Sequence, residues 1–300
     1  MGRTNEWYSP TREVTLSISK RLTLNASPNG VLGVDEGFIL FNKLEFLDKA
    51  GEWFYDESDN TVYLWTPNND SPVNYNITGS VYETGISINN SHYVTIQDLE
   101  LAHYQSSGIN ISECNHITIQ NNEIYYCEEF GIQDVSTSDD TQILNNKVEG
   151  TNGIGMLVWG EDMVIADNKI LNIGLFKDLG LKGTAAPNGG SGMEISGDDN
   201  LIQYNEIENT NYNGIFYRHN PIVQYNYIKN SCLVKDDGGG IYTGGEYSGS
   251  TVRHNIINSV PGNWTATGYD RPRSFGHGIY IDIPQKNVKV YENTVIDCGS

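Results

Sequence analysis

The sequence predicts an all-β chain folded as a parallel β-helix, a solenoid of about eight visible coils, with a small β-hairpin subdomain near its N-terminus. Three observations predict this fold. A Gly-Ile or Gly-Met pair recurs along most of the chain, and an Asn-containing segment recurs in phase with it. The composition, with 32 Gly and 19 Tyr but only 4 Met in 300 residues, disfavours a helical protein.

The first repeat signal is the glycine of the Gly-Ile or Gly-Met pair. Its spacings are 23, 23, 24, 37, 22, 26 and 38 residues, so two units carry insertions of about 14 and 15 residues, near 174–190 and 261–274. Long loops on a repeat scaffold are often functional, and both insertions lie in the second half of the chain. The repeat glycines are Gly85, Gly108, Gly131, Gly155, Gly192, Gly214, Gly240 and Gly278.

The second repeat signal is an asparagine that follows each glycine, from the second unit onward, by 12 to 15 residues. Each unit is too short for a βαβ unit, and its short alternating runs indicate strands with one buried face. Stacked coils would bring the asparagines into a ladder at about 4.8 Å intervals, with a structural role in left-handed turns. The asparagines are Asn122, Asn146, Asn168, Asn205, Asn226, Asn255 and Asn293.

Three regions are expected along the chain. Residues 1–30 form an N-terminal β segment that we interpret as a remnant of earlier coils, residues 31–80 a small β meander or hairpin subdomain, and residues 81–300 the parallel β-helix. The runs at 51–56 and 61–65 flank a Glu-Ser-Asp-Asn turn signal, which predicts the hairpin. No capping element follows the last repeat strand, so we expect the sequence to be part of a longer chain.

Charge and composition exclude several classes of function. The net charge of −20 argues against a nucleic-acid binder, because phosphate contacts need a basic face. No run approaches 18 apolar residues, and no signal peptide begins the sequence. The four cysteines match no zinc spacing and are expected to be buried free thiols. Residues 50–146 contain no Lys or Arg, so basic groups concentrate in the second half.

The outward strand positions change character along the predicted solenoid. If the residue after the repeat glycine faces the core, the second and fourth residues after it face outward. These positions are mostly small and polar in the first three coils, then become aromatic and ionisable. Aromatic platforms beside carboxylates suit a sugar, whose C–H faces stack and whose bonds acids cleave. The outward candidates are Trp159, Glu194, Phe216, Arg218, Tyr242, Tyr280 and Asp282.

Two sequence stretches narrow the candidate catalytic site. Asp236 and Asp237 precede three consecutive glycines, and in the next coil His277 precedes the repeat glycine while Asp282 follows it. Asp237 and Asp282 are the best acid/base pair, provided that the glycine turn folds Asp237 back toward the strand. If it does not, Glu194 and Glu246 replace them.

Other side chains near these stretches are candidates for binding roles. Arg218 and His219 are candidates to clamp a carboxylate or hydroxyl groups. Asp236, with Asp237, is a candidate Ca²⁺ ligand, although no cofactor is required. Trp159, Tyr242, Glu246, His277 and Tyr280 complete the predicted substrate-binding set.

Three stretches together resemble bacterial right-handed parallel β-helix proteins that act on polysaccharides. They are residues 47–56 with 62–64, the Asp-Gly-Gly-Gly-Ile-Tyr sequence at 237–242, and the Gly-Ile-Tyr-Ile-Asp sequence at 278–282. The family they resemble most is glycoside hydrolase family 141, and more distantly family 120. The resemblance implies a right-handed coil, a secreted or periplasmic location, and catalysis by two carboxylates on neighbouring coils, at the positions of Asp237 and Asp282.

The function expected first is therefore a polysaccharide-degrading glycoside hydrolase. An alternative is a polysaccharide lyase acting on uronate-containing glycans, with a cation or an Arg neutralising the uronate. Arg218, Lys235, His277, Arg271 and Arg273 are its candidate bases or neutralisers. A non-catalytic glycan-binding rod is the third hypothesis. All three have a polysaccharide or oligosaccharide partner, no nucleic acid and no membrane span, and the sequence leaves the oligomeric state open.

Overall fold

The computed structural model describes residues 12–19, 21–25, 40–136, 138–175, 189–263, 274–283 and 285–299. The described chain is built almost entirely of strands, with two short 3₁₀ helices, η1 (Leu44–Phe46) and η2 (Pro72–Asn74). The two predicted insertions fall largely at 176–188 and 264–273, outside the described residues. None of the described helices is long and apolar enough to cross a membrane.

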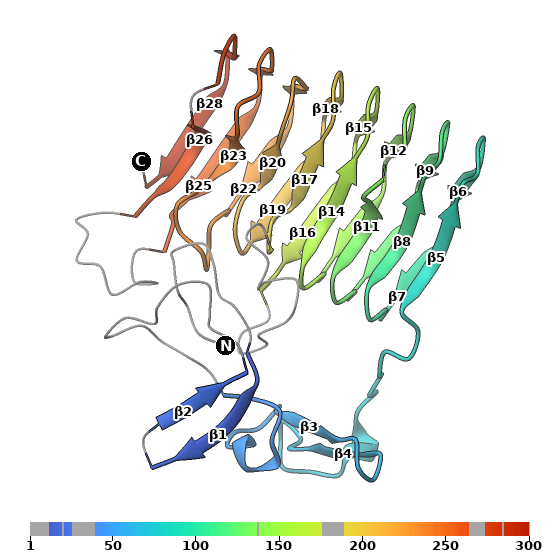
Figure 1. Cartoon of the computed structure of the whole chain (residues 1–300), viewed down its shortest axis with the longest axis vertical. Coiled ribbons are helices and arrows are strands. Elements are labelled where there is room, and N and C mark those ends of the chain that lie inside the picture. Colours follow the sequence, from blue (N-terminus) through green and yellow to red (C-terminus); the bar gives the residue numbers. More distant parts are fainter. Residues whose placement is uncertain are drawn as a thin grey trace.

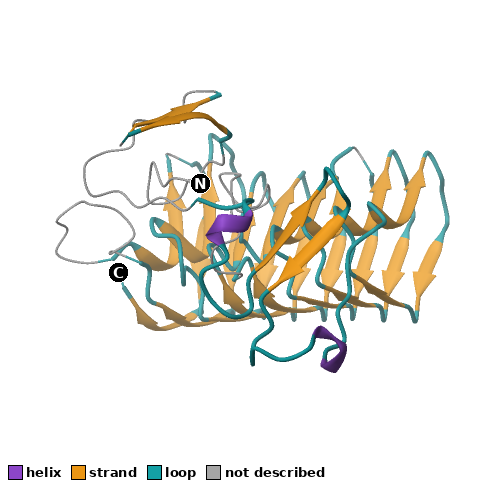
Figure 2. Ribbon diagram, turned by 90° about the horizontal axis from the view of Figure 1, so that it is seen from below, coloured by secondary structure: helices purple, strands orange, loops and turns teal. Residues whose placement is uncertain are grey.

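Three parallel sheets of eight strands form a right-handed β-helix, and each coil gives one strand to each sheet (Figures 1 and 2). The first sheet contains β5 (Thr84–Asn89), β8 (Ser107–Ser112), β11 (Phe130–Asp134), β14 (Ile154–Trp159), β17 (Met193–Ser196), β20 (Ile215–Tyr217), β23 (Gly238–Gly244) and β26 (Gly276–Asp282). The second contains β6 (Thr95–Gln97), β9 (Thr118–Gln120), β12 (Gln142–Leu144), β15 (Val164–Ala166), β18 (Leu201–Gln203), β21 (Ile222–Gln224), β24 (Thr251–Arg253) and β27 (Lys289–Tyr291). The third contains β7 (Glu100–Ala102), β10 (Glu123–Tyr125), β13 (Lys147–Glu149), β16 (Lys169–Ile173), β19 (Glu206–Thr210), β22 (Tyr227–Lys229), β25 (Ile256–Val260) and β28 (Thr294–Cys298).

The repeat glycines lie within two residues of the start of the first-sheet strands and allow neighbouring coil segments to approach closely. The apolar residue after each glycine pairs in register with its counterpart in the next coil, as Ile109 does with Ile132, and both are fully buried. A Cβ added at Gly131 would lie 2.4 Å from the Val148 side chain and 2.7 Å from the Gly155 carbonyl oxygen. Third-sheet core residues therefore occupy the space that any larger residue at this position would need.

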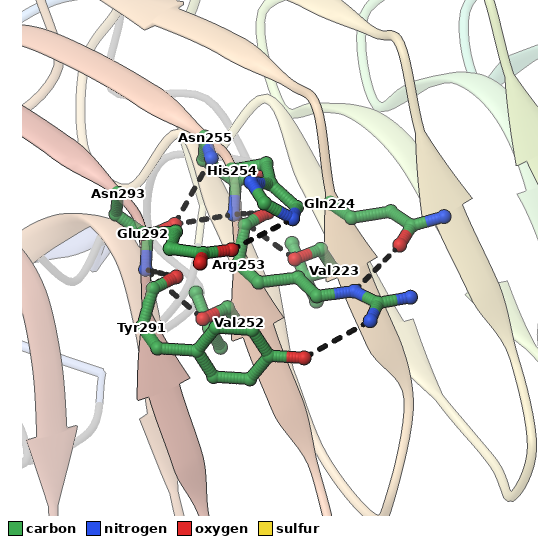
Figure 3. Close-up of polar contacts among 9 residues, drawn as sticks. All are labelled: Val223, Gln224, Val252, Arg253, His254, Asn255, Tyr291, Glu292 and Asn293. Atoms are coloured by element: carbon green, nitrogen blue, oxygen red, sulfur yellow. Dashed lines mark hydrogen bonds and ion pairs between the residues drawn. The ribbon is translucent and has the colours of Figure 1, made fainter.

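The predicted asparagine ladder is confirmed as a buried structural feature. Each inner ladder amide accepts hydrogen bonds from the preceding asparagine and donates to the next; Asn168, for example, accepts from the Asn146 backbone N–H at 2.9 Å and donates to Asn205 at 3.0 Å. Figure 3 shows the end of this ladder, where Asn255 donates to Asn293 and to the Val223 carbonyl. The left-handed conformation expected of the ladder asparagines instead belongs to the residue before each of them.

Two antiparallel hairpins from the N-terminal part of the chain lie outside the three sheets (Figure 1). The predicted hairpin is present as β3 (Trp53–Asp56) paired with β4 (Thr61–Leu64). A second hairpin pairs β1 (Val14–Ile18) with β2 (Arg21–Leu24). The cysteines are free thiols; Cys298 is partly exposed, and the other three are buried.

Candidate functional site

The candidate site lies on the outer face of the first sheet, over the last four coils. Glu194, Phe216, Tyr242 and Tyr280 occupy one register position on β17, β20, β23 and β26, so each pairs with the next across the sheet. Alternation along the strands points these four side chains away from the core, as the sequence predicts. Neighbouring coils thus place one carboxylate and three aromatic rings in a single row.

The aromatic rings of this row contact one another. The Phe216 and Tyr242 ring centroids are 5.2 Å apart, and the Tyr242 and Tyr280 centroids are 5.1 Å apart in an edge-to-face arrangement. His277, which lies at the start of β26, places its imidazole 4.1 Å from the Tyr280 ring. Such contacts fix the ring orientations and hold the phenol hydroxyls in defined positions.

The two tyrosine hydroxyls reach the two predicted catalytic carboxylates. Tyr242 Oη donates to Asp282 Oδ2 at 2.9 Å, and Tyr280 Oη approaches Asp237 Oδ1 at 3.4 Å. The Ile283 backbone N–H donates to the other Asp282 oxygen at 2.9 Å. Asp237, in the left-handed conformation with φ 57°, precedes the glycines of β23, and the turn brings its carboxylate back within reach of Tyr280.

Burial and the nearby carboxylates together raise the pKa values of the two tyrosines. Burial, followed by the hydrogen bond to Asp282, raises the pKa of Tyr242 well above its ordinary value. Burial and the nearby charges of Asp237 and then Asp282 raise the pKa of Tyr280 to about 12. Both phenols therefore stay protonated at physiological pH and act as hydrogen-bond donors to these carboxylates.

Two residues that the sequence analysis missed support the glycine turn from the preceding coil. The buried Tyr212 donates through its hydroxyl to the Asp237 backbone carbonyl at 2.7 Å. Asn213 Oδ1 accepts the Gly239 backbone N–H at 2.8 Å. Asn213 directly precedes its repeat glycine, as Gly239 precedes Gly240, so aligning that position across coils would have found this contact.

Glu194 and Arg218 form an ion pair beside the aromatic row. Arg218 Nη1 lies 2.6 Å from Glu194 Oε1, and its guanidinium covers the Phe216 ring at 4.3 Å. Glu194 and Phe216 are only 5% and 4% exposed, although both point away from the core. The expectation of an open platform at these two positions is therefore wrong, whereas a quarter of the Arg218 side chain stays accessible.

Asp236 has a structural setting that the sequence did not predict. It is 1% exposed, and its Oδ1 accepts the backbone N–H groups of Phe275 at 2.8 Å and Asn263 at 3.2 Å. Asp236 thereby joins the two chain segments that flank residues 264–273. Within the described residues no three His, Cys, Asp or Glu side chains are grouped to hold a metal ion, and the Ca²⁺ role considered for Asp236 gains no support.

The other predicted binding residues lie farther along the first-sheet strands. Trp159 ends β14 and is 40% exposed. His219 stacks on Tyr247 at 4.4 Å and lies 3.2 Å from Asp198. Glu246 is exposed in the turn after β23. The structure thus joins Asp237, Asp282 and the two tyrosines in one network. Trp159, His219 and Glu246 lie outside that network.

The fold and the network together define a parallel β-helix protein with a polar and aromatic site on one outer face. The chain belongs to the family described as the right handed beta helix region, whose model matches residues 60–176 and 84–257. No curated protein matches the sequence.

Several solved structures are similar to this chain at low sequence identity. A periplasmic alginate epimerase matches with 16% identity over 62% of this chain and 47% of its own, with a TM-score of 0.40. A DFA-IIIase from Arthrobacter chlorophenolicus A6 matches with 12% identity over 68% and 56% of the two chains and a TM-score of 0.33. An alginate lyase from Paenibacillus sp. str. FPU-7 matches with 10% identity over 65% and 79%, also at 0.33. The chain spans about half the length of the first two.

Proposed function

We propose that the protein is a polysaccharide-degrading glycoside hydrolase that uses Asp237 and Asp282. The observation that carries the proposal is the pair of carboxylates on neighbouring coils, each approached by the hydroxyl of a tyrosine from the aromatic row. Glycoside hydrolysis needs one carboxyl group to protonate the leaving oxygen and a second to act as nucleophile or to activate water. Of the rings beside them, the half-buried Tyr242 and Tyr280 offer a stacking surface to a sugar.

We assign the nucleophile or general-base role to Asp282. Both of its oxygens accept a hydrogen bond, from Tyr242 and from the Ile283 backbone, so its carboxylate has a fixed direction. Asp237 is then the acid that protonates the leaving group. The Tyr212 hydroxyl and the Asn213 amide hold the turn that carries Asp237, which gives the acid a fixed place relative to Asp282.

The described residues around Asp237 and Asp282 suit a hydrolase better than a lyase. A lyase needs a cationic group free to neutralise a uronate. Among the described residues, Arg218 is paired with Glu194 at 2.6 Å, Lys235 is buried with its amine donating to the Gly189 carbonyl, and Asp236 is engaged by two backbone N–H groups. Arg271 and Arg273 lie outside the described residues. The resemblance to glycoside hydrolase family 141 and a secreted or periplasmic location belong to the same proposal.

The test is a screen against neutral and uronate polysaccharides, with reducing ends and ultraviolet absorbance read together. The wild type is compared with Asp237→Asn and Asp282→Asn, and Glu208→Gln, on the third sheet, is the matched control. A hydrolase releases reducing ends without absorbance, and both Asp variants lose at least about 100-fold in rate while the control does not. Absorbance from unsaturated products would replace the proposal with a lyase. Glycan binding without any product would instead support a non-catalytic glycan-binding protein.

A further inference from the structure

We propose that Lys235 and Asp236 are positioning residues, which hold the catalytic acid Asp237 in place through contacts with two different parts of the chain. The proposal rests on the hydrolase function proposed above and deepens it. Lys235 and Asp236 are 2% and 1% exposed, so neither side chain is open to a polysaccharide. Burying an ionisable group is unfavourable unless the group gains fixed polar partners. The partners of these two side chains show what each of them holds.

Lys235 connects the catalytic turn to Gly189, which lies near the end of the first insertion. Its Nζ donates to the Gly189 carbonyl at 2.8 Å and lies 5.3 Å from the centre of the Tyr212 ring. The Tyr212 hydroxyl in turn donates to the Asp237 backbone carbonyl at 2.7 Å. The ammonium group of Lys235 therefore helps to fix the ring whose hydroxyl supports the acid.

Asp236 holds the same turn against the next coil. Its Oδ1 accepts the backbone N–H groups of Phe275 at 2.8 Å and Asn263 at 3.2 Å. The Gly238 backbone N–H also donates to the Phe275 carbonyl, at 3.1 Å. Phe275 directly precedes β26, the strand that ends at Asp282. The side chain of Asp236 thus sets the place of the turn relative to the second catalytic carboxylate.

The residues that follow Asp237 restrain it little. They are three consecutive glycines, at 238–240, and glycine leaves the backbone more conformational freedom than any other residue. Contacts of the preceding Lys235 and Asp236 are therefore needed to fix the direction of the acid. A misplacement of about 1 Å in a catalytic group costs about 100-fold in rate. Loss of either contact should consequently impair proton transfer from Asp237 to the leaving oxygen.

The experiment compares two substrates that differ in their need for an acid. The polysaccharide that the wild type cleaves requires protonation of its leaving oxygen, whereas a dinitrophenyl glycoside of the released oligosaccharide does not. Lys235→Met and Asp236→Ala should each lower kcat/KM for the polysaccharide by about 100-fold, and that for the dinitrophenyl glycoside by less than about threefold. Asp236→Asn keeps the Oδ1 acceptor and should stay within about threefold of the wild type on both substrates.

The matched control is Asp134→Ala. Asp134 is another buried carboxylate that accepts a backbone N–H, from Ser136, and it lies on β11, four coils before β23. Its loss should change kcat/KM for the two substrates by the same factor, because it acts on stability alone.

Several outcomes would overturn the positioning role. They are an equal loss on both substrates in Lys235→Met and Asp236→Ala, no loss in either variant, and an Asp236→Asn variant as impaired as Asp236→Ala. If only one of Lys235→Met and Asp236→Ala folds, that variant decides; if neither folds, the two residues serve stability and the proposal is wrong. The hydrolase proposal itself fails separately, when Asp237→Asn and Asp282→Asn keep their activity on the polysaccharide.

Discussion

Replacing Asp134 with Asn should stabilise the protein in a way that depends on pH. Asp134 ends β11 with its side chain inside the solenoid, in register with Ile111 and Val158, and it is fully buried. Its Oδ1 accepts a hydrogen bond from the Ser138 hydroxyl at 3.1 Å, whereas Oδ2 has no partner in the described part of the chain. Burial raises the pKa of this carboxyl from 3.8 to about 7.

The size of the effect follows from the raised pKa. Because the folded-state pKa lies above the unfolded one, the stability that neutral Asp134 permits is fully present below pH 3.8 and is lost as pH rises through 7. Raising the pKa from 3.8 to about 7 corresponds to roughly 4 kcal/mol of lost stability at pH 8, and to roughly 2 kcal/mol at pH 5. Asn carries no ionisation cost, so its stability advantage over Asp should grow by roughly 2–3 kcal/mol between these pH values.

The assay is thermal unfolding of the wild type and Asp134→Asn at pH 5 and pH 8. The gain in Tm for the variant should be larger at pH 8 by roughly 5 °C. Asp167→Asn removes the same charge from an exposed turn and should show no such difference. An advantage of Asp134→Asn that is equal at both pH values would refute the reasoning, since it would mean that this carboxyl titrates in the folded protein as it does in the unfolded chain.

Three further predictions concern the ladder, the tyrosines and the thiols. Asn168→Ala should lower the free energy of unfolding, measured in urea, by about 3–5 kcal/mol, because it leaves the Ile143 carbonyl and the Asn146 N–H buried without partners. Asn293→Ala, at the partly exposed end of the ladder, is the control, and an equal loss in the two variants would contradict the prediction. Tyr242→Phe should lower kcat by about tenfold or more and alter the acid limb of the pH–rate profile. In the wild type, an ultraviolet titration should show that neither Tyr242 nor Tyr280 ionises below pH 11, and ionisation of either below that pH would contradict the raised pKa values. A thiol reagent should modify Cys298 and spare the buried Cys127 and Cys232 in the native protein at neutral pH, because burial raises the pKa of Cys127 to about 11 and holds that of Cys232 well above its ordinary value; mass spectrometry of the labelled peptides decides.

The coil architecture could be predicted from the sequence because each coil repeats the same requirements. The close approach of neighbouring coil segments requires the glycine, the core position after it requires Ile or Met, and the buried turn requires the asparagine amide. Seven in-phase copies leave few alternatives. The same pattern placed Tyr242, Tyr280 and Asp282 on one outer face, where the structure has them.

The parts of the site that depend on chain segments outside the repeat could not be predicted in this way. Glu194 and Phe216 are buried although they point outward, and Arg218 contacts both; alternation along a strand does not predict that a neighbouring side chain will fold over them. The return of Asp237 toward Tyr280 depends on the backbone of a glycine turn and on its support by Tyr212, which belongs to another coil. The setting of Asp236 depends on backbone N–H groups from distant residues, to which side-chain identity gives no clue.

The asparagine ladder makes the molecule divisible into interchangeable lengths. An inner ladder amide bonds to the asparagine before it, through that residue's side chain and backbone N–H, to the asparagine after it, and to a nearby backbone carbonyl, and these partners are the same in every coil. Deletion of residues 123–146 would remove 24 residues, one whole turn of the solenoid, and Asn122 would then meet Asn168 as Asn146 does now. The length of such a protein is therefore free to change by whole turns near one end while the carboxylates and tyrosines near the other keep their spacing.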